Sequence, residues 1–157
     1  MNECAMQYAI FRQNNNWKDC YPNIYIPGTN AEIDVLRLTK TNRCIFYEIK
    51  ISYADFLRDM KKPRHGQLVD GSFPIMPSRF WYVIYGFDVP KDKIPVYSGV
   101  LRVTKACGLV TEMKAPLLNG TVLTACQVAK LDASLVWRFR NLMIKKAKEI
   151  WEEKKDV

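Results

Sequence analysis

Three carboxylic acids and one amine are the residues of this sequence whose types and spacing best suit catalysis: Glu32, Asp34, Glu48 and Lys50. They lie in two segments that are otherwise mostly apolar, residues 31–39 (AEIDVLRLT) and 43–51 (RCIFYEIKI). Such segments are typical of β-strands, and the three residues between them, Lys40-Thr41-Asn42, suit a tight turn because Asn tolerates a positive φ. The two segments therefore predict a β-hairpin.

The register of this hairpin decides which charges meet. If Thr41 is the centre of the turn, Asp34 lies opposite Glu48 and Glu32 lies opposite Lys50. Because side chains alternate between the two faces of a strand, all four would project to the same side. We therefore expect one end of the hairpin to gather three negative charges and one positive charge.

The rest of the hairpin is apolar on both faces, with Arg37 as the exception, as expected for buried strands. Burying carboxylates without partners is costly, and Asp34 opposite Glu48 adds repulsion that Lys50 offsets only in part. A divalent cation would remove the conflict, and Mg²⁺ prefers carboxylate and carbonyl oxygens. The alternative is a charged ladder across a half-exposed hairpin, which needs no ion.

The elements that would position this cluster follow from the remaining patterns. Ser52, with Asp55 three residues later, predicts the start of a helix over 53–62 that ends at Pro63 and Gly66. Apolar periodicity predicts the other elements: a short helix over 3–13, strands over 19–26, 79–85, 99–104 and 108–113, an exposed loop over 89–95, and a long helix over about 132–155. The order favours a single α/β domain with a mixed central sheet flanked by helices.

A basic run follows the cluster in sequence and is a candidate nucleic-acid contact. Lys61, Lys62 and Arg64 would reach phosphates beside the site, although a solvated helix end explains them equally well. His65 is less suited as a general base, because Lys50 and a metal-bound water would already serve that chemistry.

Several other polar and aromatic residues have a structural interpretation. Ser52 and Asp55 are expected to cap their helix, and Asp59 to pair with a nearby lysine or to help position Lys50. The alternation in residues 79–85 (RFWYVIY) favours a core strand over a platform for stacking bases.

Composition limits the class of protein. The chain has 157 residues, a net charge of +8 and a pI near 9.3, which points to a polyanionic partner. No apolar run approaches the roughly 20 residues that span a bilayer, and the first residues lack the features of a signal peptide, so we expect a soluble, cytoplasmic protein. The five cysteines are odd in number and widely spaced, which favours free thiols over a zinc site or disulfides.

The long C-terminal segment predicts an amphipathic helix. Its apolar stripe contains Leu135, Phe139, Leu142, Met143, Ile150 and Trp151. That stripe would suit burial against a second copy of the chain, so a homodimer is one expectation. Its basic side chains are mixed with glutamates, which favours a solvated face over a DNA contact.

Asp34 followed by Glu48-Ile49-Lys50 resembles the motif of the PD-(D/E)XK, or restriction-endonuclease-like, nuclease superfamily. The resemblance extends over about residues 30–118, through the ordered runs AEIDVLRL, IFYEIKISYADFLRDMKK, SRFWYVIY, IPVYSGVLRV and MKAPLL. This order is similar to the MmcB-like DNA-repair branch, in which E-[IV]-K-x-S-x-x-D-F-x-x-D-x-K is characteristic. The proline that usually precedes the first acid is absent, and Ile33 stands in its place.

The resemblance implies a restriction-endonuclease-like core and a role for each motif residue. Asp34 and Glu48 would ligate Mg²⁺ or Mn²⁺, with the backbone carbonyl of Ile49 completing the coordination and Glu3 of the first helix as a further candidate ligand. Lys50 would orient or activate the attacking water and stabilise charge on the phosphate. The implied protein is a deoxyribonuclease of DNA repair, recombination or phage DNA processing. The alternative is a DNA-binding protein that keeps the nuclease fold without cutting.

Overall fold

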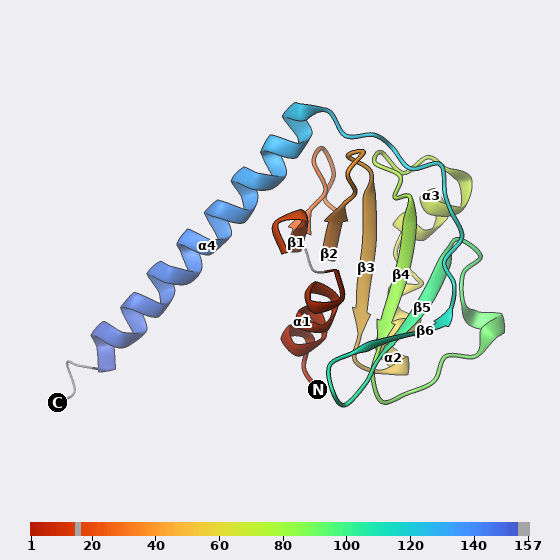
Figure 1. The fold of residues 1–157 in the computed structure, drawn as a ribbon, viewed down its shortest axis with the longest axis horizontal. Helices are drawn as coiled ribbons and strands as arrows, with labels where there is room; N and C mark the ends of the chain where they lie inside the picture. The colour runs from red at the N-terminus through yellow and green to blue at the C-terminus, as the bar shows by residue number, and fades with distance from the viewer. Residues whose placement is uncertain (15–16, 154–157) are drawn as a thin grey trace.

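A six-stranded mixed sheet forms the centre of the computed structural model, which describes residues 1–14 and 17–153 (Figure 1). The strands are β1 (Cys20–Tyr25), β2 (Glu32–Leu38), β3 (Cys44–Lys50), β4 (Arg79–Ile84), β5 (Ser98–Val103) and β6 (Leu109–Met113). They stand side by side in chain order, with β3, β4 and β5 parallel and all other neighbours antiparallel. The expected mixed α/β fold is confirmed.

Helices cover both faces of the sheet, and each covered face has its own core. Helix α1 (Glu3–Asn14) buries Met6 and Ile10 against a cluster that includes Val35 of β2 and Val83 of β4. On the opposite face, α2 (Tyr53–Asp59) and α3 (Arg64–Asp70) pack against the larger cluster. That cluster includes the fully buried side chains Leu36, Phe46, Phe56, Phe80 and Tyr82. Residues 79–85 therefore supply a core strand, as their alternation predicted. The short 3₁₀ helices are η1 (Trp17–Asp19) and η2 (Lys91–Lys93), the second within the expected loop.

The hairpin of β2 and β3 has the predicted register over the pairs from Leu38↔Cys44 to Val35↔Tyr47. Asn42 adopts a φ of 53° in the turn, as expected for an Asn there. The alternation fails at one point. Ile33 packs in the same cluster as Leu36, whereas Val35 between them faces α1, so the regular alternation of faces is interrupted around Asp34.

The segment after β3 forms two short helices rather than the single helix over 53–62. Helix α2 ends at Asp59 with Met60 as its C-cap, and Pro63 precedes the separate helix α3, which contains Gly66. The prediction that Gly66 ends a helix was wrong. A proline has no backbone N–H to donate to the preceding helical turn, so it interrupts a helix there. Its fixed φ nevertheless suits the start of the next helix.

Helix α4 (Ala125–Glu153) begins earlier than the predicted residue 132. The reason is a capping box: Gln127 N donates to Thr124 Oγ1 at 3.2 Å, and Thr124 N donates to Gln127 Oε1 at 2.9 Å. The helix then runs outward from the sheet beyond its contact with β1 (Figure 1). Leu135 is half-buried, but Phe139, Leu142 and Met143 of the predicted stripe are more than 50% exposed within this chain. The side chains of Ile150 and Trp151 lie outside the described part.

Two compositional expectations are answered by the structure. All five cysteines are free thiols. Among the described residues, no helix combines the length and apolar character needed to span a membrane.

Candidate functional site

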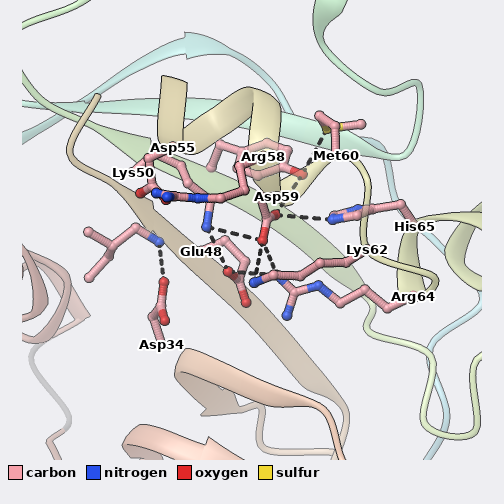
Figure 2. A network of polar contacts seen from close by, with 12 residues as sticks. Asp34, Glu48, Lys50, Asp55, Arg58, Asp59, Met60, Lys62, Arg64 and His65 are labelled. Carbon is pink, nitrogen blue, oxygen red and sulfur yellow. Dashed lines mark hydrogen bonds and ion pairs between the residues drawn. The ribbon is translucent and has the colours of Figure 1, made fainter. Parts of the chain in front are cut away.

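Asp34 lies at the point where β2 separates from β3. Its Oδ2 accepts a hydrogen bond of 2.7 Å from the backbone N–H of Ile49 (Figure 2), while its own carbonyl accepts one of 3.3 Å from Gln7 Nε2. Burial and the nearby charge of Glu48 raise the pKa of Asp34 to about 7, although Lys50 acts in the opposite direction. A further cation near Asp34 would therefore stabilise its charged form.

Glu48 and Lys50 lie on the face of β3 that α2 and α3 cover, and both are almost fully buried. Lys50 Nζ donates to Glu48 Oε2 at 3.1 Å, and Arg64 Nη2 approaches the same oxygen at 2.8 Å. The other carboxylate oxygen, Glu48 Oε1, is buried and has no hydrogen-bond partner within the part of the chain that the structure describes. A buried carboxylate oxygen without a partner is costly, so a water molecule or a cation bound at this atom would stabilise the site.

Asp59, from the end of α2, connects the basic side chains of the site (Figure 2). Its Oδ1 lies 3.3 Å from Lys50 Nζ, 2.7 Å from Arg64 Nη2 and 2.7 Å from Lys62 Nζ. Burial alone would raise the pKa of Asp59, but the hydrogen bond from His65 and the charges of Arg64 and Lys50 hold it well below its ordinary value. The lowered pKa favours the charged form of Asp59. The prediction that Asp59 pairs with a nearby lysine is confirmed by its contact with Lys62, and the alternative, a contact with Lys50, is present as well.

A second layer of polar side chains supports Asp59 from behind. His65 Nε2 lies 3.0 Å from Asp59 Oδ2, and its Nδ1 is hydrogen-bonded to the hydroxyl of Tyr97. Tyr82 O–H donates to the same Asp59 oxygen at 3.4 Å. His65 is buried and engaged through both ring nitrogens, so its contacts hold the Asp59 carboxylate in place.

Glu32 does not belong to this cluster, and that prediction was wrong. Its carboxylate forms an ion pair of 2.8 Å with Arg138 of α4, and only its backbone carbonyl faces the site, where it accepts from Arg64 Nη1 at 3.0 Å. The cause is the interrupted alternation around Asp34 and the presence of α4 beside β1. The acid that joins Glu48 is Asp59 instead, and Lys50 pairs with these two.

The basic run also differs from expectation. Arg64 was predicted to be a surface contact for phosphate, but it is buried between Glu48 and Asp59. Lys62 pairs with Asp59 while remaining about half exposed, and Lys61 is exposed. Ser52 accepts from Asp55 N at 3.1 Å as the predicted N-cap, and the carboxylate of Asp55 pairs with Arg58.

Helix α1 brings one predicted residue and one unforeseen residue to the same place. Glu3 is exposed, but its charge contributes to the raised pKa of Asp34, so it lies near that carboxyl. Gln7, one turn later, is buried and links Glu3 Oε1, Asn23 Oδ1 and the carbonyl of Asp34. A buried glutamine on the apolar face of a predicted helix was the available signal for this link.

The balance of charge in the site changes the argument made from the sequence. The buried anions Glu48 and Asp59 are matched in charge by the buried cations Lys50 and Arg64, so these four balance one another, although Glu48 Oε1 still lacks a hydrogen-bond partner among the described residues. The remaining uncompensated group is Asp34. Among the residues that the structure describes, no three His, Cys, Asp or Glu side chains are grouped as around a metal ion.

Two carboxylates nevertheless fit a hard divalent cation. Asp34 uses Oδ2 for Ile49 N and accepts a proton readily, while Glu48 keeps Oε1 without a partner. Mg²⁺ is commonly held by one or two carboxylates and completes its shell with water, so a third acidic side chain is not required. The donor set of Asp34, Glu48 and the Ile49 carbonyl is compatible with Mg²⁺ or Mn²⁺.

Comparison with known proteins places the fold in a structural class and leaves the activity open. No family model and no curated protein sequence matches this chain. The fold is a mixed α/β fold with a six-stranded sheet and a C-terminal helix, and it is shared by a solved structure, the SPO1766 protein of unknown function from Silicibacter pomeroyi. That structure has a TM-score of 0.58 and 21% sequence identity, over 92% of this chain and 90% of the other. At this identity the likeness concerns the fold alone.

Proposed function

We propose that this protein is a Mg²⁺- or Mn²⁺-dependent deoxyribonuclease with a restriction-endonuclease-like core, acting in DNA repair, recombination or phage DNA processing. The observation that carries the proposal is a pair of neighbouring carboxyl groups that the described side chains do not fully stabilise. Glu48 presents a buried oxygen without a partner, and beside it Asp34 has a pKa raised to about 7. The resemblance of Asp34 and Glu48-Ile49-Lys50 to the PD-(D/E)XK motif and the net charge of +8 support the same function.

In this proposal, Asp34, Glu48 and the backbone carbonyl of Ile49 hold the metal. A bound divalent ion would supply positive charge next to the phosphodiester. It would also lower the pKa of a water molecule bound to it, so that this water becomes a nucleophile at neutral pH. The hydrogen bond from Ile49 N fixes the orientation of the Asp34 carboxylate. Gln7 fixes the backbone of the same residue, so the first acid is held from two sides.

Lys50 acts in this proposal as a fixed cation rather than as a base. Burial lowers the pKa of Lys50, but the charges of Glu48, Asp59 and Asp34 outweigh burial and raise the pKa above its ordinary value. An ammonium group that keeps its proton would stabilise negative charge on the phosphate and could not itself accept the proton of the attacking water, which a bound metal would make acidic enough to lose to solvent. Asp59 and Arg64 are positioning residues, since they hold Lys50 and Glu48 in place.

The test is a cleavage assay with purified protein on plasmid, linear, single-stranded and branched DNA in Mg²⁺ or Mn²⁺. Asp34→Asn is the main variant, because an asparagine keeps an acceptor for Ile49 N while it loses the charge. Lys50→Ala is the second, and we expect each to lower cleavage by about 100-fold or more. Lys93→Ala is the matched control, since this exposed lysine pairs with Asp92 and contacts none of the site residues. Failure of both metals on every substrate would refute the enzyme.

The rival function is a DNA-binding protein that keeps this fold without cutting. Calorimetric titration with Mn²⁺ separates the two, because a pure binder has no use for a metal ion at Asp34. Wild-type protein is expected to show a saturable heat that Asp34→Asn abolishes and Lys93→Ala retains. Retention of DNA without any Asp34-dependent heat would favour the binder.

A further inference from the structure

A cavity of about 580 Å³ lies beside the start of α3 and is lined by Arg64, which pairs with Glu48 of the candidate site. It is open to solvent on one side and is lined by the loop between β1 and β2, by the chain around Pro63 and Arg64, and by Phe73 and Pro74. Its volume lies in the range of about 300–1,000 Å³ that is typical of small-ligand sites. The cavity is therefore large enough for a nucleoside.

The walls of the cavity combine aromatic and polar groups. Tyr25, at the end of β1, is 53% exposed and borders the cavity, while Phe73 forms part of its buried wall. Thr29, Asn30 and Gln67 add hydroxyl and amide groups able to hydrogen-bond a base edge. An exposed aromatic ring beside amide groups is the composition of a site for a flat heterocycle.

The charge of the cavity suits a phosphate at its inner end. Lys62 and Arg64 line it there, and the Nε of Arg64 has no acceptor among the described residues. The acid on the wall, Glu32, is neutralised by Arg138, whose guanidinium also lies 5.7 Å from the centre of the Tyr25 ring. The three charged residues that line the cavity, Glu32, Lys62 and Arg64, sum to one positive charge, and Lys62 and Arg64 are also paired with Asp59 and Glu48 of the site.

Two side chains, Lys62 and Arg64, both line the cavity and contact the candidate catalytic cluster. Arg64 lines the cavity and at the same time lies 2.8 Å from Glu48 Oε2 and 2.7 Å from Asp59 Oδ1. A nucleotide in the cavity would therefore place its neighbouring phosphate towards the carboxylates of the site. A ligand that displaces Arg64 would therefore also change the contact between Arg64 and Glu48.

We propose that this cavity binds one unpaired nucleotide of a DNA strand, next to the phosphate that is cut, so that the substrate is single-stranded or locally unpaired DNA. The proposal rests on the nuclease function proposed above and adds the class of its substrate. A base can stack on Tyr25 and reach Asn30 and Gln67 only after it has left its partner, because a paired and stacked base is closed on both faces.

The experiment measures binding separately from cutting. Fluorescence anisotropy of a labelled 15-mer, single-stranded or as a duplex, is recorded with the full-length protein in Ca²⁺, and a gel checks that the DNA stays intact. We expect tighter binding of the single strand, and a loss of about 5-fold or more of this affinity in Tyr25→Ala, with little change for the duplex. Tyr25→Phe keeps the stacking ring and should retain the wild-type affinity.

A second pair of variants fills the cavity instead of removing a contact. Asn30→Trp places a large side chain at its wall and should weaken single-strand binding to a similar extent. Asn119→Trp is its matched control, because Asn119 is an exposed loop asparagine that does not line the cavity. Thermal unfolding of each variant shows whether it has kept its fold.

Three outcomes would overturn the proposal. Wild-type single-strand affinity in both Tyr25→Ala and Asn30→Trp would show that the cavity takes no base. Equal losses for single strand and duplex would point to contacts with the phosphate backbone alone. Competition by deoxynucleoside monophosphates as strong as that of the oligonucleotide would assign the cavity to a free nucleotide.

The same set of variants separates this proposal from the proposed function. Binding of the single strand through the cavity, without cleavage in Mg²⁺ or Mn²⁺, would refute the nuclease while the cavity keeps its ligand. Cleavage of duplex and single strand at equal rates, unaffected by Tyr25→Ala, would support the nuclease and refute the cavity as its substrate site.

Discussion

Replacing Asp34 with asparagine should stabilise this protein, and the gain should grow with pH. The pKa of Asp34 is raised to about 7 from an ordinary value of 3.8, first by burial and then by Glu48. The native state therefore holds this proton more tightly than the unfolded chain does. Stability contributed by the protonated carboxyl is complete below about pH 4 and is lost as the pH rises towards 7.

The size of the effect follows from the two pKa values. The shift corresponds to about 4 kcal/mol of lost stability at pH 8, and to only about 1.5–2 kcal/mol at pH 5, where the native carboxyl is still protonated. Asparagine carries no charge at either pH and can still accept from Ile49 N. The gain in the free energy of unfolding for Asp34→Asn should thus be about 2.5 kcal/mol larger at pH 8 than at pH 5.

The assay is urea unfolding in EDTA, followed by the fluorescence of the four tryptophans, at both pH values. Any difference in packing between the two side chains is common to both pH values and cancels. Asp92→Asn is the matched control, because the Asp92 side chain is 71% exposed, and its effect should stay within about 0.5 kcal/mol at either pH. An equal gain for Asp34→Asn at pH 5 and pH 8 would refute the burial of an uncompensated carboxyl at this position.

Three further outcomes follow from contacts of the site and the sheet. The affinity for Mn²⁺ should rise about tenfold per pH unit below pH 7 and level off above it, because the ion competes with the proton on Asp34. Calorimetry at pH 5.5, 6.5 and 8 would measure this affinity. An affinity that does not change with pH would contradict the prediction. Asp59→Ala should destabilise the fold by about 3–5 kcal/mol in urea unfolding, since two buried cations would be left to share the single anion Glu48, whereas a loss below about 1 kcal/mol would contradict that role. Gly99→Ala should lower the unfolding free energy by at least about 1–3 kcal/mol, because its Cβ would lie 2.6 Å from Trp81 Cζ3; unchanged stability would show that the neighbouring segment gives way.

The sequence was sufficient for the elements whose signal is local. The hairpin register followed from the centre of its turn, and the core role of residues 79–85 from their alternation. The capping-box pattern of Thr124 and Gln127 is also present in the sequence and predicts the observed start of α4. Such features depend on neighbours within a few residues, so the pattern alone predicts them.

The composition of the site depended on contacts that no local pattern encodes. Asp59, and not Glu32, contacts Lys50, because α2 packs over β3 and brings Asp59 to the site. Glu32 instead forms an ion pair with Arg138 of α4. Arg64 entered the site because Pro63 starts a new helix whose first turn is buried. Both events join segments far apart in the chain, and the interrupted alternation around Asp34 adds a local departure that an ideal strand does not predict.

Helix α4 has a consequence for how this molecule opens in solution. Arg138 is half-buried, and the side chains of residues 139–146 that follow it are all exposed. These outer turns can lose their helical hydrogen bonds without uncovering the core, so their amides should exchange with solvent far sooner than those of β3 and β4. Slow trimming by trypsin past Arg140 should accordingly leave a truncated chain that still unfolds cooperatively.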